Sequence, residues 1–326
     1  MEYHGARLSA RARARRHKPS WPSVIATTLR LWLERHHVFA PSRRVAVTLA
    51  AVAIAAGVSG VFIVHATTSA ASRDPGPRSV SAAALGASAA TRGAAARWIA
   101  GQLAASAIVA CDPAMCAALQ ADGLPAARLL VLGTATADPL GSDVVVATPA
   151  VRNEFGTRLQ NVYAPVVIAS FGTGAGRIDI RAIAPDGTAA YEMALAADRL
   201  SRMSAGRQLL ANPRITVASG ARTALTAGDV DPRLLMMLAA LVVEQPVRIT
   251  AFGDPSPGAS PIVPLRSVQL APLGSGAKAK ASLRSMLSFV AAQQQPFQPL
   301  RADLAGSSAL MVEYAAPSPL GLLGSP

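Results

Sequence analysis

The chain is poor in histidine, lysine, aromatic residues and cysteine, and the histidines are the most informative of these. All five histidines lie at or before His65. Residues 66–326 therefore have no histidine for Ser-His-Asp or Cys-His catalysis, for a zinc site or for a pH switch. This absence excludes more chemistry than any motif in the same region suggests.

Charged residues are also scarce, at 15% of the chain, while 51% of the residues are apolar and 4% are aromatic. This composition is too hydrophobic for a disordered protein and too poor in charge for a coiled coil. The 326 residues are enough for one large domain or two modest ones. A folded region of about 220 residues buries a core of its own, so the fold does not require a disulfide framework.

The net charge of +13 is concentrated at the N-terminus, where residues 1–44 carry ten Lys or Arg and only two Glu. Such a tail is typical of a nucleic-acid arm or of the cytoplasmic flank of a membrane anchor. The next stretch, residues 45–64, has no charged side chain, and as a helix it would span about 30 Å of bilayer. Because the Lys/Arg excess stays on the cytoplasmic side, we expect a cytoplasmic N-terminus, one transmembrane helix and extracytoplasmic residues 66–326. The lipid bilayer then explains the charges, and we expect no nucleic-acid partner.

An export signal is the alternative interpretation of the same segment. Ser42-Arg43-Arg44 resembles a twin-arginine signal, and small residues follow at 66–71, so the chain would be exported after cleavage near Ala70. The bulky residues that usually follow such arginines are absent, which favours the uncleaved anchor. Both interpretations place the rest of the chain outside the cytoplasm.

The composition divides the chain into six segments. We expect a basic cytoplasmic tail with a candidate amphipathic helix, a transmembrane helix, an Ala/Ser/Gly/Pro tether, two external α/β units and a disordered tail. These cover residues 1–44, 45–64, 65–95, 96–218, 219–316 and 317–326 respectively.

Helical and strand patterns alternate along the external region, which predicts an Ala-rich α/β domain of mixed sheet and helices, with α+β as the alternative. The octet P-V-x-I-x-x-F-G occurs at 165–172 and again at 246–253. Each copy follows a helical pattern and precedes a second strand, a long helix and a closing strand. The closing strand of the first copy is at 214–217. We therefore expect two related units stacked side by side, although chance similarity in an Ala-rich chain is the competing explanation.

The only cysteines, Cys111 and Cys116, flank a helix start in the stretch ACDPAMC. With Asp112 as N-cap and Pro113 in the first turn, the two cysteines occupy positions that contact each other in a hydrophobic staple. We expect a disulfide between them, and two reduced buried thiols are the alternative. Two sulfurs do not complete a zinc site, so we expect neither a metal nor a cofactor.

Four residues are weak candidates for catalysis. Ser275 and Lys278 match S-x-x-K at a predicted helix start, but the partner motifs of the penicillin-binding enzymes are absent after them. A solvated helix N-terminus is the simpler interpretation. Asp179 and Asp254 lie in or after predicted strands, where acids or bases of a glycan-active enzyme would be placed.

The stretches CDPAMCAALQADG (111–123) and DPLGSDVVVAT (138–148) carry a resemblance to actinobacterial single-pass envelope proteins of unassigned function. The resemblance implies a location and no activity. We therefore expect a non-catalytic, membrane-anchored external domain that binds an envelope protein or a glycan. The alternative is an envelope hydrolase or transferase that uses Ser275 and Lys278 or the external aspartates.

Overall fold

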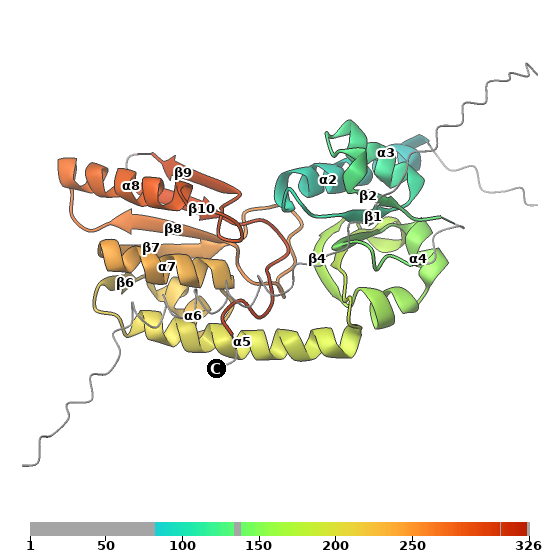
Figure 1. The fold of residues 1–326 in the computed structure, drawn as a ribbon. Coiled ribbons are helices and arrows are strands. Elements are labelled where there is room, and N and C mark those ends of the chain that lie inside the picture. Colours follow the sequence, from blue (N-terminus) through green and yellow to red (C-terminus); the bar gives the residue numbers. More distant parts are fainter. Residues whose placement is uncertain (1–81, 134–137, 307, 325–326) are drawn as a thin grey trace, which may run out of the picture. The chain divides into compact units, whose positions relative to one another are not determined.

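The computed structural model describes residues 82–133, 138–306 and 308–324, all within one compact unit, Pro77–Pro326. This unit contains two five-stranded mixed sheets and the helices that pack on them (Figure 1). The predicted α/β class is thus confirmed. The predicted transmembrane segment 45–64 lies outside the described residues. Among the helices that are described, none combines the length and apolar character that crossing a bilayer requires.

The first sheet has helices on both faces. Strands β2, β1 and β3 are parallel neighbours, and β5 and β4 continue the sheet in antiparallel pairing. Helices α2 and α3 cover one face, while α4 and the π-helical turn η2 cover the other. The strands are β1 (Val109–Cys111), β2 (Leu129–Val131), β3 (Val144–Ala147), β4 (Val166–Phe171) and β5 (Ile178–Ala182). The helical elements are α2 (Ala82–Gln102), α3 (Pro113–Ala121), η1 (Ala126–Arg128), α4 (Pro149–Phe155), η2 (Leu159–Tyr163) and η3 (Gly174–Gly176).

The second sheet has the order β6-β7-β8-β10-β9, and only the β6–β7 pair is parallel. Apolar side chains of α6, α7 and α8 form one core with its inner face. Helix α7 is the most apolar of these helices, and its first turn is capped by Asp231 and contains Pro232. The strands are β6 (Ile215–Val217), β7 (Val247–Gly253), β8 (Ser267–Pro272), β9 (Arg301–Ala305) and β10 (Ala309–Glu313). The helices are α5 (Thr188–Leu210), α6 (Ser219–Ala227), α7 (Pro232–Glu244) and α8 (Gly276–Ala291).

The predicted tether is too long, because α2 begins at Ala82 rather than near residue 95. Alanine has the highest helix propensity of all residues, and its small side chain also permits close packing. Ala95 and Ala96 are fully buried, and Trp98 and Ile99 on the same helix enter the core of the first sheet. An Ala-rich stretch that resembles a linker in composition is therefore a core helix.

The predicted boundary between the two external units is also wrong. The strand expected to close the first unit is β6, and it pairs with β7 in the second sheet. Helix α5 packs on α6 and α7, so it too contacts the second half. The two octets form β4 and β7, each the first strand of a hairpin with a register shift near its middle. The sheets around these hairpins differ, since β5 also pairs with the earlier strand β3 and β8 with the later strand β10.

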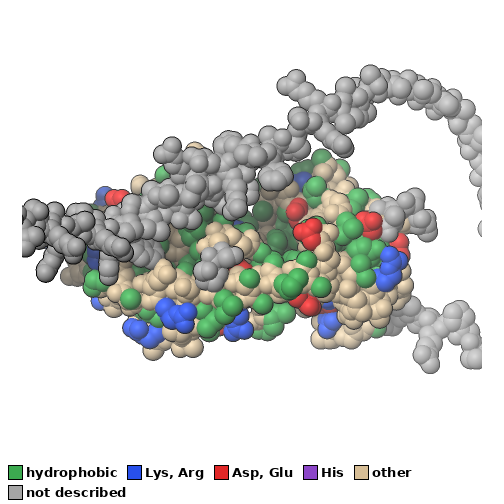
Figure 2. Space-filling view, turned by 60° about the horizontal axis from the view of Figure 1, so that its bottom comes forward, with side chains coloured by type: hydrophobic (Ala, Val, Ile, Leu, Met, Phe, Trp, Pro, Cys, Tyr) green, Lys and Arg blue, Asp and Glu red, His purple; other side chains and the backbone are tan. Residues whose placement is uncertain are grey.

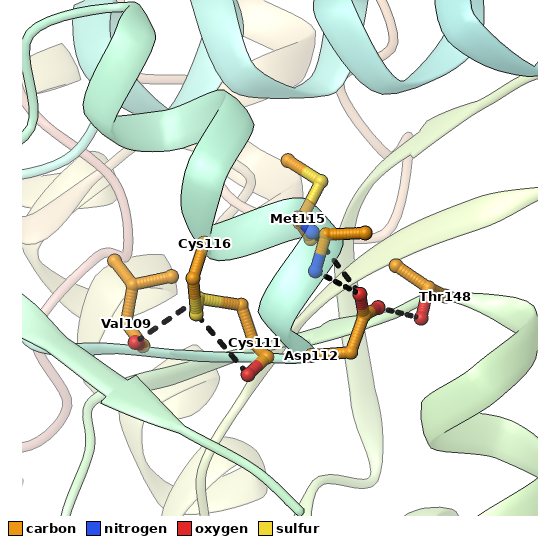
Figure 3. The surroundings of a disulfide bond; sticks show 7 residues. Val109, Cys111, Asp112, Met115, Cys116 and Thr148 are labelled. Atoms are coloured by element: carbon orange, nitrogen blue, oxygen red, sulfur yellow. Dashed lines mark hydrogen bonds between the residues drawn. A yellow bond between two sulfur atoms is a disulfide. The ribbon is translucent and has the colours of Figure 1, made fainter. Parts of the chain in front are cut away.

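Cys111 and Cys116 form a disulfide at the end of β1, with their Cα atoms 5.5 Å apart (Figure 3). Asp112 between them caps α3, because its carboxylate accepts hydrogen bonds from the backbone N–H groups of Ala114 and Met115. Both cysteines are buried. Closing so short a loop stabilises the fold by about 2 kcal/mol in the chain-entropy model. The disulfide thus serves mainly to fix the corner between β1 and α3.

Helices α5 and α6 approach so closely at Gly206 that no side chain fits between them. A Cβ atom added to Gly206 would lie 2.2 Å from the carbonyl oxygen of Leu225. Backbone atoms do not move aside as a flexible side chain does. The contact between α5 and the second half therefore requires glycine at this position.

We expect Gly206→Ala to destabilise the 77–326 unit by about 3 kcal/mol, because α5 and α6 must move apart. Gly220→Ala in α6 is the matched control, since a Cβ there meets no atom within 4 Å. Alanine also favours the helix, so the control should be neutral or slightly stabilising. Urea unfolding followed by circular dichroism measures both. Equal stability of the two variants would contradict the close packing.

Candidate functional site

Arg266 is the most heavily bonded side chain of the structure and lies just before β8. Its guanidinium binds the Asp254 carboxylate through two hydrogen bonds, from Nε at 2.8 Å and from Nη2 at 2.9 Å. Ser256 accepts a further bond from Nη2 and donates its own hydroxyl to Asp254. The Arg266 side chain is only 2% exposed and that of Asp254 only 9%. The candidate carboxylate Asp254 is therefore one half of a buried ion pair.

The same guanidinium joins segments that are far apart in the sequence. It donates to the Tyr314 carbonyl after β10 at 2.9 Å and to the Gln102 side chain of α2 at 3.1 Å. It also lies over the Trp98 ring, 6.0 Å from its centroid. Through Arg266, the β7–β8 connection, the end of β10 and helix α2 are held against one another.

Two more buried arginine–aspartate pairs follow the same design. Arg233 binds Asp231, the N-cap of α7, at 2.7 Å and also donates to the Ala315 carbonyl at 2.6 Å. Arg202 binds Asp198 at 2.8 Å within α5. Burial raises the pKa of Asp198, although the Arg202 charge opposes this effect. We refer to these pairs, together with Arg266–Asp254, as the three-pair clasp.

We expected a disordered tail at 317–326, but the three-pair clasp holds the part of it that the structure describes, residues 317–324. Ser318 donates its hydroxyl to Asp231 at 2.5 Å, and the Gly321 N–H donates to Asp198 at 3.1 Å. The Gly324 carbonyl accepts a hydrogen bond from Ser201 of α5 at 2.8 Å. A run of Ser, Gly and Pro with no internal regularity is therefore fixed by distant side chains.

A small apolar recess of ≈ 100 Å³, partly open to solvent, lies beside the clasp. Its walls come from β4, α5, the β7–β8 connection and the C-terminal segment. Aliphatic and proline side chains dominate, while Arg266 in the wall already has its hydrogen bonds within the protein. The residues around it are Val166, Ile168, Tyr191, Leu195, Ile262, Val263, Pro264, Arg266, Ala316, Pro317, Ser318 and Leu320.

Two tyrosines near the recess remain protonated at neutral pH. Burial raises the pKa of Tyr191, and the negative charge of Asp198 raises it further. Burial and Asp231 likewise raise the pKa of Tyr314, whose hydroxyl has no hydrogen-bond partner. A raised tyrosine pKa excludes these phenols as bases at neutral pH.

The carboxyl ends of β1 and β3 form a second candidate site, because α3 and α4 leave this edge toward opposite faces of the sheet. Ligands of α/β proteins commonly bind at such a topological switch point. Here, however, the Thr148 hydroxyl that caps α4 donates to Asp112, which caps α3 (Figure 3). The Thr148 hydroxyl and the Asp112 carboxylate therefore satisfy each other's hydrogen-bonding capacity, which indicates a structural role at this edge of the sheet.

Asp179 lies at the same edge and is paired in the same manner. It accepts hydrogen bonds from Ser170 at 2.7 Å and from Arg177 at 2.9 Å, and it is 1% exposed. Arg181 is two residues further along β5, where burial lowers its pKa while Asp179 raises it. Asp179 thus stabilises the β4–β5 hairpin, and it belongs to the first sheet, whereas Asp254 belongs to the second.

Ser275 and Lys278 are exposed in the first turn of α8. The Ser275 side chain makes no capping hydrogen bond, and the structure shows none between it and Lys278. A serine nucleophile needs an activating base held against its hydroxyl. The geometry therefore does not assemble this pair, nor does it bring the pair to either aspartate.

Within the described residues, no group of three or more His, Cys, Asp or Glu side chains is arranged to hold a metal ion. Searches with the chain find no matching family model, no similar curated protein and no similar solved structure. The candidate sites are therefore judged on geometry alone, which favours the apolar recess.

Removing the Arg266 guanidinium should cost far more than removing an exposed arginine. Arg266→Met leaves the Asp254 carboxylate buried and unpaired, and we expect a loss of about 4 kcal/mol in unfolding free energy. Adding Asp254→Leu should recover most of the loss, because the unpaired charge is then gone. Arg248→Met is the control, because the Arg248 side chain on β7 is exposed. Its unfolding free energy should stay within about 0.5 kcal/mol of the wild-type value. Urea titration of the wild type, the Arg266→Met and Asp254→Leu single variants, the double variant and the control decides, and additivity of the two substitutions would refute the coupling.

Proposed function

We propose that the chain is a membrane-anchored extracytoplasmic binding or scaffold protein of the bacterial cell envelope, without catalytic activity. The observation that carries the proposal is a net charge of +8 in residues 1–44, directly before twenty residues with no charge. The disulfide supports an extracytoplasmic position, because disulfides persist in oxidising compartments.

The pairing of the candidate catalytic residues supports a binding role over an enzymatic one. Asp254 and Asp179 are held in ion pairs with arginines, while Ser275 and Lys278 stand on an exposed turn. An acid or base must be free to exchange its proton with a substrate. The envelope hydrolase or transferase therefore has no supporting geometry in the described residues.

The apolar recess supports a protein partner over a glycan. Glycans are recognised through many hydroxyl groups, which require free hydrogen-bonding partners in the site. The recess instead offers aliphatic walls, and Ile262 at its rim is 73% exposed. An apolar side chain of an envelope protein fits this surface, because buried apolar anchors provide most of the affinity in such contacts.

The topology can be tested by placing single cysteines in the full chain, whose own cysteines are joined in a buried disulfide. Ala277→Cys on exposed α8 should react with a membrane-impermeant maleimide in spheroplasts. Ser20→Cys in the basic tail should react only after lysis. The reverse pattern would refute the proposed orientation. A product shortened by about seventy residues and extractable with carbonate would show the cleaved, exported form instead.

The recess can be tested by a photo-crosslinking amino acid at position 262 of the full chain in intact cells. We expect a protein adduct at 262 and none at the control position 277. Leu195→Arg should abolish the adduct, because it places a charge in the wall of the recess. An adduct that persists with Leu195→Arg would assign the partner contact to another surface.

A further inference from the structure

Helix α5 presents an apolar stripe that no other described element covers. Met193 is 69% exposed and Leu200 is 59% exposed, and seven residues separate them, so they share one side of the helix. Ala196 and Ala197 are exposed between them, and Arg207 follows on the same line after seven more residues. Single exposed apolar side chains are common on protein surfaces, whereas apolar neighbours along one side of a helix form a continuous strip that can contact a partner or a lipid.

Positive charge surrounds the C-terminal half of this stripe. Residues 198–326 contain twelve Lys or Arg and seven Asp or Glu, and the three-pair clasp neutralises three of each, so nine basic and four acidic side chains remain outside it. In Figure 2, several Lys and Arg side chains lie between apolar patches on the lower left of the face. Arg199, Arg207, Arg214 and Arg222 are exposed on α5, α6 and the connection between them.

The exposed acidic residues near α5 leave most of its length without negative charge. Asp186 and Glu192 are exposed at the N-terminal end of α5. Asp229 lies 3.8 Å from Arg199, where both side chains are more than half exposed, so water screens the pair. The face is thus apolar in its middle, basic toward the C-terminal end of α5 and acidic at the other end.

The chain length places a bilayer within reach of this face. Seventeen residues separate the apolar segment 45–64 from Ala82, and they span at most about 60 Å. A unit of this size has a diameter of about 45 Å. Every face of the unit can therefore contact the membrane, and the face that matches lipid chemistry will be favoured.

We propose that this face of α5 docks on the anionic lipid surface of the membrane. Met193 and Leu200 enter the interface, while Arg207 and Arg222 contact lipid phosphates. Helix α5 then lies along the membrane surface, with Met193 and Leu200 both in the interface and the arginines toward its C-terminal end facing the lipid phosphates. This inference rests on the proposed membrane anchor, and it adds an orientation in which the β7–β8 connection and the recess are fixed relative to the bilayer.

The test uses the full chain with Met193→Cys carrying an environment-sensitive fluorophore, reconstituted in lipid nanodiscs. With phosphatidylglycerol present, we expect a blue shift of the emission and quenching by nitroxide-labelled lipid. Both effects should fall in pure phosphatidylcholine and in 0.5 M salt, where the screening length is about 4 Å. A fluorophore at Ala277→Cys is the matched control and should report water in every condition.

Arginine variants measure the electrostatic part of the docking. Arg207→Gln and Arg222→Gln should each lower the ratio of docked to free protein about fivefold, the effect of one basic residue near an anionic surface. Arg284→Gln on α8 should leave the ratio unchanged. The proposal would be overturned if the emission of the fluorophore at position 193 matched that of the position-277 control in all lipids. It would also be overturned if neither arginine variant changed the emission at position 193.

Retention of the chain in the nanodisc tests the anchor separately. If the chain is not retained, the same fluorophore is read after phosphatidylglycerol vesicles are added, so that docking is still decided. A blue shift that requires envelope extract rather than lipid would assign the face to a protein partner and would also overturn the proposal.

Discussion

The buried Arg266 guanidinium is the interaction on which the assembly of the two sheets depends. All three of its nitrogen atoms donate hydrogen bonds, and the acceptors come from α2, the β7–β8 connection and the end of β10. A buried charge that loses its partners costs several kcal/mol. The guanidinium is therefore stable only when these segments are in place, and its bond to Gln102 of α2 contributes to holding the two halves of the compact unit together.

The same device recurs along the C-terminal segment. Each pair of the three-pair clasp is held in a helix or between strands, and each also binds a backbone or hydroxyl group of residues 314–321. This fixed segment forms part of the wall of the apolar recess. The ion pairs thus hold part of the wall of the recess in place, while the surface of the recess itself is apolar. That division of roles suits a domain that binds and does not catalyse.

Local signals predicted a large part of this fold. The Asp112-Pro113 pair marked the start of α3, because both the cap and the proline act within one helical turn. The spacing of Cys111 and Cys116 suited a disulfide, which the structure contains. The predictions that were wrong concerned segments without a local signal. The Ala-rich start of α2 resembled a tether, and the Ser/Gly/Pro tail resembled disorder, until their distant partners were known.

The sequence by itself determined that histidine chemistry is unavailable beyond residue 65, that a helix begins after Asp112, and which segment is apolar enough for an anchor. These properties depend on residue type and on neighbours within a few positions. Only the tertiary structure decided that β6 joins the second sheet, that Asp179 and Asp254 are ion-paired and that the tail is bound. In each case the deciding contact involves a partner set by the fold, and Ser201, for example, reaches across 123 positions to Gly324. Local patterns carry no information about such pairings, because chain folding alone brings these groups together.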